Sequence, residues 1–469
     1  MIAASMSAFA AAADKVSVTF NDITEGNTLK LYKVAAATVA ADNTLSFTMT
    51  SGLPEAYDEI TEIQELGKET ATEAQVKAMA DAYGAFFGGK TADFSQAAGS
   101  DKKATVSVDP GYYFAIISGD KDTSVVYKNM LVDATPVAKE DGTYDAHAAI
   151  NREVKKENIT ITKTEPDPTT TAATAHTTDG YYQGDKIPFT ITTTIPNYPS
   201  TSTHATFVIT DTPNGVNDII SENFVVKVDG QETAATSGDN KTYTVETKAA
   251  GNYNGFTVTF DKYFILAHAG KSVVVTYEGT LDAPINLKGG TSNTADITYN
   301  PNPFEETTVK PGDTDEQYQF GLVVFKYEEK ADKADKSTKL PGAEFELYES
   351  KAKSEEDTTL VIDETKKVRG ATATNGNGLL SWDGLKSGTY FLKETKAPAG
   401  YTKITDPIQV VVTKNTATGD NKMTADKTEE YFLKVEVPNE KGQSLPETEQ
   451  RRMSITGLSG NGWRRIPRY

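Results

Sequence analysis

Three polar residues in the C-terminal part of the chain occupy positions that an alternating strand pattern assigns to a hydrophobic core. Side chains two residues apart on a strand point to the same face, so Lys326, Glu394 and Asn439 each share a face with apolar neighbours. Those neighbours are Leu322 and Val324, Tyr390 and Leu392, and Leu433, Val435 and Val437. A buried charge without a partner is very costly. We therefore expect the lysine, the glutamate and the asparagine to lie together.

A second set of the same kind occurs earlier in the chain, with Lys163, Asp211 and Asn293 at the corresponding positions. The apolar residues that share their faces are Ile159 and Ile161, Phe207 and Ile209, and Ala295, Ile297 and Tyr299. In both sets the lysine is on the first strand of its segment and the asparagine is near the end. First and last strands are often neighbours in sandwiches, so each lysine is expected to lie beside its asparagine.

This combination of residue types predicts an amide-forming reaction inside the protein. Burial favours the neutral form of a lysine amine and the protonated form of a carboxyl group. A neutral amine can attack the side-chain carbonyl of asparagine, while the acid polarises that carbonyl and shuttles protons as ammonia leaves. The predicted products are Lys163–Asn293 and Lys326–Asn439 isopeptide crosslinks, assisted by Asp211 and Glu394. Each bond forms once, so we predict self-crosslinking and not an enzyme.

A simpler interpretation is that each lysine lies near a strand end, extends its ammonium group to solvent and forms an ordinary ion pair with the acid. The recurrence of the set with the same chain order favours the crosslinks.

Composition excludes several other functions. The 469 residues suggest about three domains, and a net charge of −19 opposes binding to nucleic acid. Cysteine is absent, which excludes disulfides and thiolate sites. The four histidines, His147, His176, His204 and His268, are far apart in sequence, so neither a metal site nor another cofactor is expected.

Helical periodicity is confined to the first of the predicted domains. Thr72 and Gln75 form a capping-box pattern, and an apolar stripe follows at helical spacing and ends at Gly88. The stripe consists of Val76, Met79, Tyr83 and Phe86, and we interpret it as core packing in preference to a binding groove. Elsewhere strand patterns dominate, so the predicted class is all-β, with tandem immunoglobulin-like sandwiches and one helical insertion. Pro301-Asn-Pro303 and Pro311-Gly-Asp-Thr314 suggest a linker after the second sandwich.

Several motifs in the C-terminal domain resemble those of a known family. Tyr390-Phe-Leu-Lys-Glu-Thr-Lys-Ala-Pro-Ala-Gly-Tyr401 resembles the E-box of Gram-positive sortase-assembled pilins and of the Cna B-type domains of surface adhesins. Leu340-Pro-Gly-Ala-Glu-Phe-Glu-Leu-Tyr348 and Thr374-Asn-Gly-Asn-Gly-Leu-Leu-Ser-Trp-Asp-Gly-Leu385 are similar to strands and a turn of that domain. The resemblance implies Cna-type sandwiches, with Lys326 and Asn439 crosslinked and Glu394 assisting.

The domain boundaries follow from this resemblance and from the composition. We predict a residual signal peptide (1–13), an N-terminal pilin domain (14–156), a middle Cna-type isopeptide domain (157–316), a Cna B-type domain (317–442) and a sorting-signal remnant with a basic tail (443–469). In the N-terminal domain, aligning Gly111–Ile117 with Gly388–Glu394 places Ile117 where the acid belongs. No crosslink is therefore predicted for Lys33.

Two features depart from the family pattern. Shaft pilins carry a linking lysine in a Tyr-Pro-Lys-like motif, whereas the corresponding region here lacks the proline and offers Lys155 or Lys156. An ordinary solvated lysine is an equal alternative at these positions. Leu445-Pro-Glu-Thr448 matches the start of a sorting signal, but Glu449 replaces the expected glycine and an arginine-rich tail follows.

The resemblance implies a shaft subunit of a covalently polymerised pilus on a Gram-positive cell wall. A class C-type pilus sortase would join Thr448 of one copy to a lysine of the next, and minor pilins would be further partners. The alternative is a cell-wall-anchored adhesin that binds host matrix protein or glycan and uses the same domains as a stalk.

Overall fold

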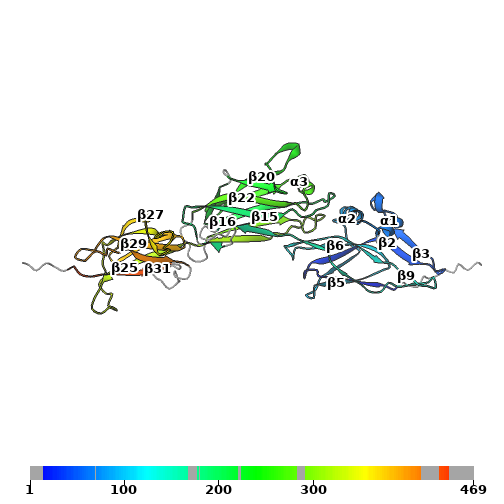
Figure 1. Ribbon diagram of the computed structural model, residues 1–469. Coiled ribbons are helices and arrows are strands. Elements are labelled where there is room, and N and C mark those ends of the chain that lie inside the picture. Colours follow the sequence, from blue (N-terminus) through cyan, green and yellow to red (C-terminus); the bar gives the residue numbers. More distant parts are fainter. Residues whose placement is uncertain are drawn as a thin grey trace, which may run out of the picture. The chain divides into compact units, whose positions relative to one another are not determined.

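The structure is a computed structural model that describes residues 14–68, 70–166, 177–178, 180–219, 223–282, 291–413 and 432–442. Strands make up most of it, and helices are few (Figure 1). The predicted all-β class with a helical insertion is thus confirmed. The signal-like segment 1–13 and the tail from 443 lie outside the described residues.

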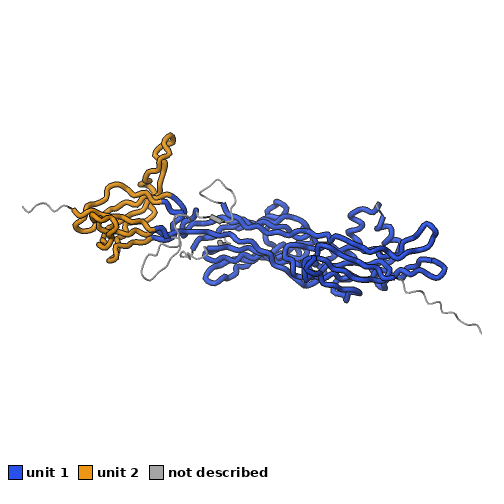
Figure 2. The backbone as a smooth tube through the Cα atoms, turned by 90° about the horizontal axis from the view of Figure 1, so that it is seen from below, with its two compact units in different colours: residues 1–322, 382–388, 411–433 blue, residues 323–381, 389–410, 434–469 orange. Residues whose placement is uncertain are grey.

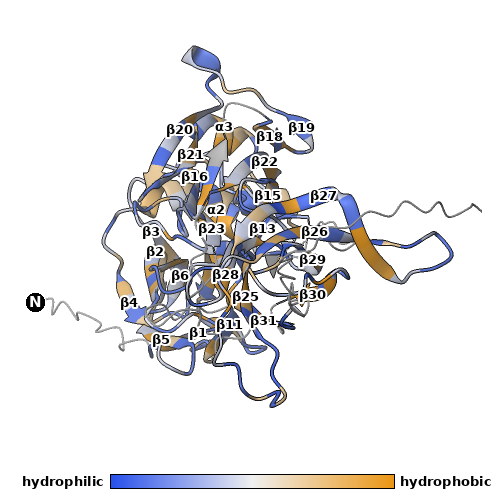
Figure 3. Ribbon diagram, turned by 90° about the vertical axis from the view of Figure 1, so that its left-hand side faces the viewer, coloured by the Kyte–Doolittle hydropathy of each residue, from blue (hydrophilic) through white to orange (hydrophobic). Residues whose placement is uncertain are grey.

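The N-terminal sandwich consists of two sheets that enclose one core. Its sheets have the strand orders β11-β1-β5 and β3-β2-β6-β8, and β4 pairs with β2. Alternate residues of β1 (Val16, Val18 and Phe20) are buried, as the sequence pattern predicts, and Figure 3 shows the mixture of hydrophobic and hydrophilic residues along the strands. The strands of the sandwich and of two small pairs are β1 (Val16–Asn21), β2 (Thr28–Val39), β3 (Leu45–Met49), β4 (Phe94–Ala97), β5 (Lys103–Val108), β6 (Gly111–Ser118), β7 (Val125–Tyr127), β8 (Met130–Ala134), β9 (Val137–Ala138), β10 (Tyr144–Asp145), β11 (Ile150–Glu153) and β12 (Lys156–Asn158).

The helical insertion lies beside β2 and β6 and packs on their outer face (Figure 1). It comprises η1 (Glu55–Tyr57), α1 (Ile60–Leu66) and α2 (Glu73–Phe87). The predicted capping box is present, because the Gln75 backbone N–H donates to the Thr72 side chain and the Gln75 side chain accepts from the Thr72 backbone. Met79 and Tyr83 are buried in this cluster as predicted, whereas Val76 is 39% exposed.

The middle sandwich has two six-stranded sheets. One has the order β13-β15-β22-β18-β19 with β17 paired to β22, and the other has the order β14-β24-β23-β16-β21-β20. A short helix, α3 (Lys262–Ala267), packs at its side. The strands are β13 (Ile161–Thr164), β14 (Thr177–Thr178), β15 (Lys186–Thr194), β16 (Phe207–Asn214), β17 (Val216–Ile219), β18 (Val225–Val228), β19 (Gln231–Glu232), β20 (Tyr243–Ala250), β21 (Tyr253–Phe260), β22 (Ser272–Leu281), β23 (Thr291–Tyr299) and β24 (Gly312–Gln317), and a one-turn helix η2 (Gly238–Asn240) precedes β20.

The prediction of a linker after the second sandwich was wrong. Gly312–Gln317 is strand β24, which pairs with β23 and completes a sheet. Phe304 is buried, and a Cβ added at Gly84 of α2 would come within 2.3 Å of its ring. The prolines of this region therefore belong to a loop that packs on α2 of the N-terminal sandwich and leads into β24.

The C-terminal part forms sheets of order β28-β25-β31 and β27-β26-β29-β30. Its strands are β25 (Phe320–Glu328), β26 (Glu344–Ala352), β27 (Leu360–Ala373), β28 (Leu379–Leu385), β29 (Gly388–Lys396), β30 (Ile408–Val412) and β31 (Phe432–Asn439).

The chain divides into two compact units (Figure 2). The first comprises residues 1–322, 382–388 and 411–433, and it contains the N-terminal and middle sandwiches. The second comprises residues 323–381, 389–410 and 434–469, and it contains Lys326, Glu394 and Asn439. Within the described ranges, no helix has the length and apolar character needed to cross a bilayer.

Candidate crosslinking sites

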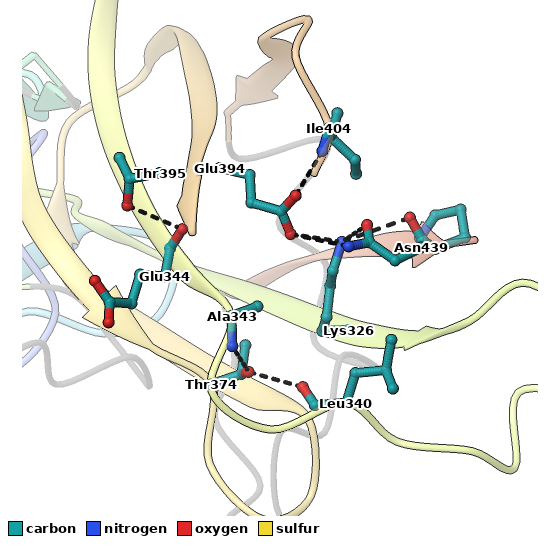
Figure 4. A network of polar contacts seen from close by, with 10 residues as sticks. Lys326, Leu340, Ala343, Glu344, Thr374, Glu394, Thr395, Ile404 and Asn439 are labelled. Atoms are coloured by element: carbon teal, nitrogen blue, oxygen red, sulfur yellow. Dashed lines mark hydrogen bonds and ion pairs between the residues drawn. The ribbon is translucent and has the colours of Figure 1, made fainter. Parts of the chain in front are cut away.

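Lys326, Glu394 and Asn439 meet in a buried cluster, as their strand parity predicts. Lys326 lies on β25, Glu394 on β29 and Asn439 on β31, and their exposed fractions are 0%, 3% and 2%. The Lys326 Nζ donates to Asn439 Oδ1 and lies 3.1 Å from Glu394 Oε1. The Asn439 Nδ2 donates to the same carboxylate oxygen at 3.3 Å. Each of the three side chains therefore contacts the other two (Figure 4).

The surroundings of this cluster favour a reactive amine. Burial lowers the pKa of Lys326 to about 8, although the neighbouring Glu394 opposes that change. The second oxygen of Glu394 accepts a hydrogen bond from the Ile404 backbone N–H at 2.7 Å, which fixes the carboxyl group (Figure 4). The Phe345 ring lies 5.3 Å from the Lys326 Nζ and excludes water from one side.

A glycine turn fixes the backbone of Lys326. The Lys326 N–H donates to the Gly378 carbonyl at 2.7 Å, and its own carbonyl accepts from the Leu340 N–H at 3.0 Å. Gly378 has φ of 69°, and a Cβ there would come within 2.3 Å of the Lys326 carbonyl oxygen. Gly378, which lies within the motif Thr374–Leu385, therefore requires glycine for two reasons: its φ is positive, and there is no space for a Cβ.

Lys163, Asp211 and Asn293 also meet, and all three are fully buried. The Lys163 Nζ donates to Asp211 Oδ1 and to the hydroxyl of Tyr277. The Asn293 Nδ2 donates to that same hydroxyl at 3.2 Å. The Phe189 ring lies 4.7 Å from the Lys163 Nζ, so the amine is enclosed by aromatic side chains.

The two clusters are assembled differently by the sheets. In the C-terminal part, β25 and β31 are hydrogen-bonded neighbours, so Lys326 and Asn439 lie on one sheet as expected. In the middle sandwich, Lys163 lies on the sheet of β13 and β22, whereas Asp211 and Asn293 lie on paired strands of the other sheet. The first strand β13 is close in space to β23 and β24, as expected, but it is not hydrogen-bonded to them, because β23 is an inner strand between β16 and β24 of the facing sheet.

Sequence reasoning missed Tyr277. It lies on β22 and shares a face with Val273 and Val275, so strand parity places its hydroxyl in the core. A tyrosine at a core position carries a polar group that needs a partner there, and that signal would have pointed to it.

In the N-terminal sandwich, Lys33 and Ile117 do not form a comparable cluster. Both lie on paired strands, but Lys33 is opposite Tyr113 while Ile117 is opposite Leu29. Ile117 is buried, whereas Lys33 is only partly buried and its backbone N–H donates to Asp93.

The two candidate linking lysines differ in their surroundings. The Lys156 Nζ lies 2.7 Å from Asp22, and this hydrogen bond raises the pKa of Lys156. Lys155 lines a groove of about 480 Å³ and forms no ion pair within the described part of the chain. Other residues that line the groove include Val76, Lys77, Tyr127, Pro199 and Phe304. The acceptor candidate Thr448 lies outside the described residues.

Comparisons with known proteins give relatives of one kind. Residues 328–427 match the SpaA family, which is described as a prealbumin-like fold domain. The chain is 28% identical over 268 residues to a fimbrial subunit type 1 of Actinomyces viscosus, a match that covers 48% of this chain and 50% of that protein. The chain thus spans about half the length of this curated relative.

Solved structures share the fold over nearly the whole chain. The T6 backbone pilin of serotype M6 Streptococcus pyogenes has a TM-score of 0.62 at 18% identity, covering 92% of this chain and 99% of that one. The resemblance to Gram-positive pilins is confirmed. The structure of the major pilin SpaA of Corynebacterium diphtheriae, which is said to point to a modular pilus assembly stabilizing isopeptide bonds, has a TM-score of 0.51 at 13% identity. That match covers 91% of this chain and 100% of the SpaA chain.

Proposed function

We propose that this protein is the structural subunit of a covalently polymerised pilus on the surface of a Gram-positive bacterium. Two intramolecular isopeptide bonds, Lys163–Asn293 and Lys326–Asn439, would stabilise it. The observation that carries the proposal is that lysine, acid and asparagine meet in dry surroundings twice in one chain. The pilin relatives support the same function.

The reaction at the C-terminal site would proceed without an outside reagent. The neutral Lys326 amine attacks Cγ of Asn439, and a carbon–nitrogen bond forms there. Glu394 contacts both nitrogens, so it can take the proton that the amine loses and deliver it to Nδ2. The bond between Cγ and Nδ2 then breaks, ammonia leaves and the carboxyl group is regenerated.

A crosslink of this kind suits a protein that bears load. Cysteine is absent, so disulfides cannot bind the strands together. By analogy with disulfides, closing a loop of about 100 residues stabilises a protein by about 4–5 kcal/mol on the entropic description. We further propose three domains at 14–156, 157–316 and 317–442, two of which carry a crosslink.

We infer that Lys155 links neighbouring subunits, with sortase joining its amine to the Thr448 carbonyl of another copy. Lys155 is exposed, lines a groove and has no carboxylate partner within the described residues, whereas Lys156 is held by Asp22. Two other lysines of the groove are less available, because Lys77 pairs with Asp81 and Lys128 pairs with Glu157.

The intact mass of the purified protein tests the crosslinks. It should be lower than the sequence mass by the mass of two ammonia molecules. A mass equal to that of the sequence would contradict the proposal.

Incubation with a pilus sortase tests the linkage between subunits: Lys155→Ala should prevent covalent ladders, and Lys156→Ala should leave them unchanged. Ladders that persist in Lys155→Ala, or monomers that bind collagen or fibronectin instead, would contradict the shaft role.

A further inference from the structure

We propose that Tyr277 is a catalytic residue of the middle crosslink, where its hydroxyl relays a proton from the attacking amine to the departing nitrogen. This inference rests on the proposed function, since it names the group that moves the proton in the reaction between Lys163 and Asn293.

The contacts of the hydroxyl carry the proposal. The Tyr277 oxygen accepts hydrogen bonds from the Lys163 Nζ and, at 3.2 Å, from the Asn293 Nδ2. These are the nitrogen that must lose a proton and the nitrogen that must gain one. A group that bridges both atoms is placed to transfer it, because general acid–base catalysis requires hydrogen-bond reach of the proton.

In the C-terminal site, a carboxylate makes the corresponding pair of contacts with the amine and the amide nitrogen. There, Glu394 Oε1 lies 3.1 Å from the Lys326 Nζ and accepts from the Asn439 Nδ2 at 3.3 Å. One carboxylate oxygen therefore bridges both nitrogens. In the middle site the bridging atom is the Tyr277 oxygen.

Asp211 has a different set of contacts from Glu394. Its side chain is one methylene shorter, and its Oδ1 accepts from the Lys163 Nζ. Its Oδ2 is buried and has no hydrogen-bond partner among the residues that the structure describes. We infer that the aspartic acid orients the amine and that the tyrosine hydroxyl supplies the bridge to the amide.

The tyrosine ring is held in a fixed position, as a relay requires. Tyr277 stacks on Phe189 with ring centroids 5.4 Å apart and makes an edge contact with Phe256 at 4.8 Å. Phe189 lies directly opposite on the paired strand β15. These contacts fix the ring, so the oxygen already lies between the two nitrogens when the reaction begins, and only the O–H bond has to turn toward Nδ2.

The neutral Lys163 amine attacks Cγ of Asn293, and the new bond forms between Nζ and Cγ. The Tyr277 oxygen takes a proton from Nζ and gives its own proton to Nδ2, which becomes basic once the carbon is tetrahedral. The bond between Cγ and Nδ2 breaks, ammonia leaves and the phenol is restored.

The test measures the rate of each crosslink separately. Full-length protein is made by cell-free synthesis and quenched in acid at timed points, and the branched peptides are quantified by mass spectrometry. Tyr277→Phe should slow formation of the Lys163–Asn293 bond by at least about tenfold and leave the Lys326–Asn439 bond unchanged. Tyr243→Phe is the matched control, because its hydroxyl lies in the same sandwich and donates to the Thr233 carbonyl.

A second variant separates the chemical role from a packing role. A phenolate has no proton to give to Nδ2, so the rate of the middle crosslink should decline at high pH. Site-specific 3,5-difluorotyrosine at position 277 keeps the ring but makes the phenol more acidic, so this decline should begin at a lower pH. A purely structural hydroxyl would leave this profile unchanged. The relay is overturned if Tyr277→Phe crosslinks at the wild-type rate, or if the fluorinated protein keeps the wild-type profile. If the wild-type chain never forms a Lys163–Asn293 peptide, the proposed function fails at this site and the relay with it.

Discussion

The middle and C-terminal sites bring the same kinds of residue together by different routes. In the C-terminal site, Lys326 and Asn439 lie on neighbouring strands of one sheet, and Glu394 reaches them from another sheet. In the middle site, Lys163 reaches across the sandwich to Asp211 on the opposite sheet and is connected to Asn293 of that sheet through the Tyr277 hydroxyl. One crosslink would therefore join strands within a sheet, and the other would join two sheets through the core.

The two sites also differ in their acid, which is Glu394 in the C-terminal site and Asp211 in the middle site. Glutamate is long enough for one oxygen to contact both nitrogens, whereas at the aspartate site the hydroxyl of Tyr277 makes the two contacts. The difference indicates that the contacts among polar atoms define such a site, and that neither strand order nor the identity of the acid does so alone.

Removing either acid should have the largest effect, and it should be confined to one site. Glu394→Ala should abolish the Lys326–Asn439 bond, and Asp211→Ala should abolish the Lys163–Asn293 bond, because each carboxyl group serves one amine. Each variant should regain the mass of one ammonia molecule and lose about 4–5 kcal/mol of unfolding free energy on the entropic description of loop closure. Intact mass and chemical denaturation measure these changes.

The matched control for this pair is Glu364→Ala, which removes an acid that pairs with Lys393 on the exposed surface. It should change neither the mass deficit nor the stability appreciably. A variant of one site that loses both crosslinks would show that the sites are not independent.

Shortening the glutamate tests whether side-chain length explains the difference between the sites. Glu394→Asp should slow the C-terminal crosslink by about tenfold, because the shorter carboxyl group cannot keep its oxygen on both nitrogens without a tyrosine beside it. Timed mass spectrometry gives the rate, with the middle crosslink of the same molecule as internal control. An unchanged rate would mean that bridging by a single oxygen is unimportant.

The pH dependence of the C-terminal reaction follows from the amine. Burial lowers the pKa of Lys326 to about 8, so the neutral amine predominates only above that pH. The rate should fall by about tenfold for each pH unit below this value and level off above it. The rate of bond formation in buffers on both sides of pH 8 tests this, and a rate that does not rise with pH would contradict an attack by the neutral amine.

The smallest expected effect concerns the turn that supports Lys326. Gly378→Ala should cost about 1–3 kcal/mol of stability, because φ is positive and the new methyl would meet the Lys326 carbonyl. Denaturation is best measured in an Asn439→Ala background, where no crosslink masks the loss. Gly376→Ala is the control, since a Cβ there meets no atom within 4 Å. Equal losses in both would contradict a specific role for Gly378.

Strand parity was sufficient to place all six residues of the two clusters in buried positions, because each has apolar neighbours two residues away along its strand. It also predicted which three belong together. Parity says nothing about which strands pair, so the position of Asn293 on an inner strand of the facing sheet could not be foreseen. Parity does not single out Tyr277 either, because an aromatic residue at a core position of an apolar strand is common in sandwiches.

The surroundings of Lys155 were equally inaccessible to sequence reasoning. The groove is lined by segments from α2, from β7, from the region of Pro199 and from the loop at Phe304, which are far apart in the chain. The prolines near Phe304 suggested a linker because proline commonly ends strands. In the structure the same prolines belong to a loop that packs on α2 and leads into β24.

Tandem mass spectrometry of a proteolytic digest tests most directly whether the two buried clusters react. Branched peptides that join Lys163 to Asn293 and Lys326 to Asn439, each lacking one ammonia, are the predicted result. Unbranched peptides that carry these lysines and intact asparagines would contradict it, and the clusters would then be ordinary buried ion pairs.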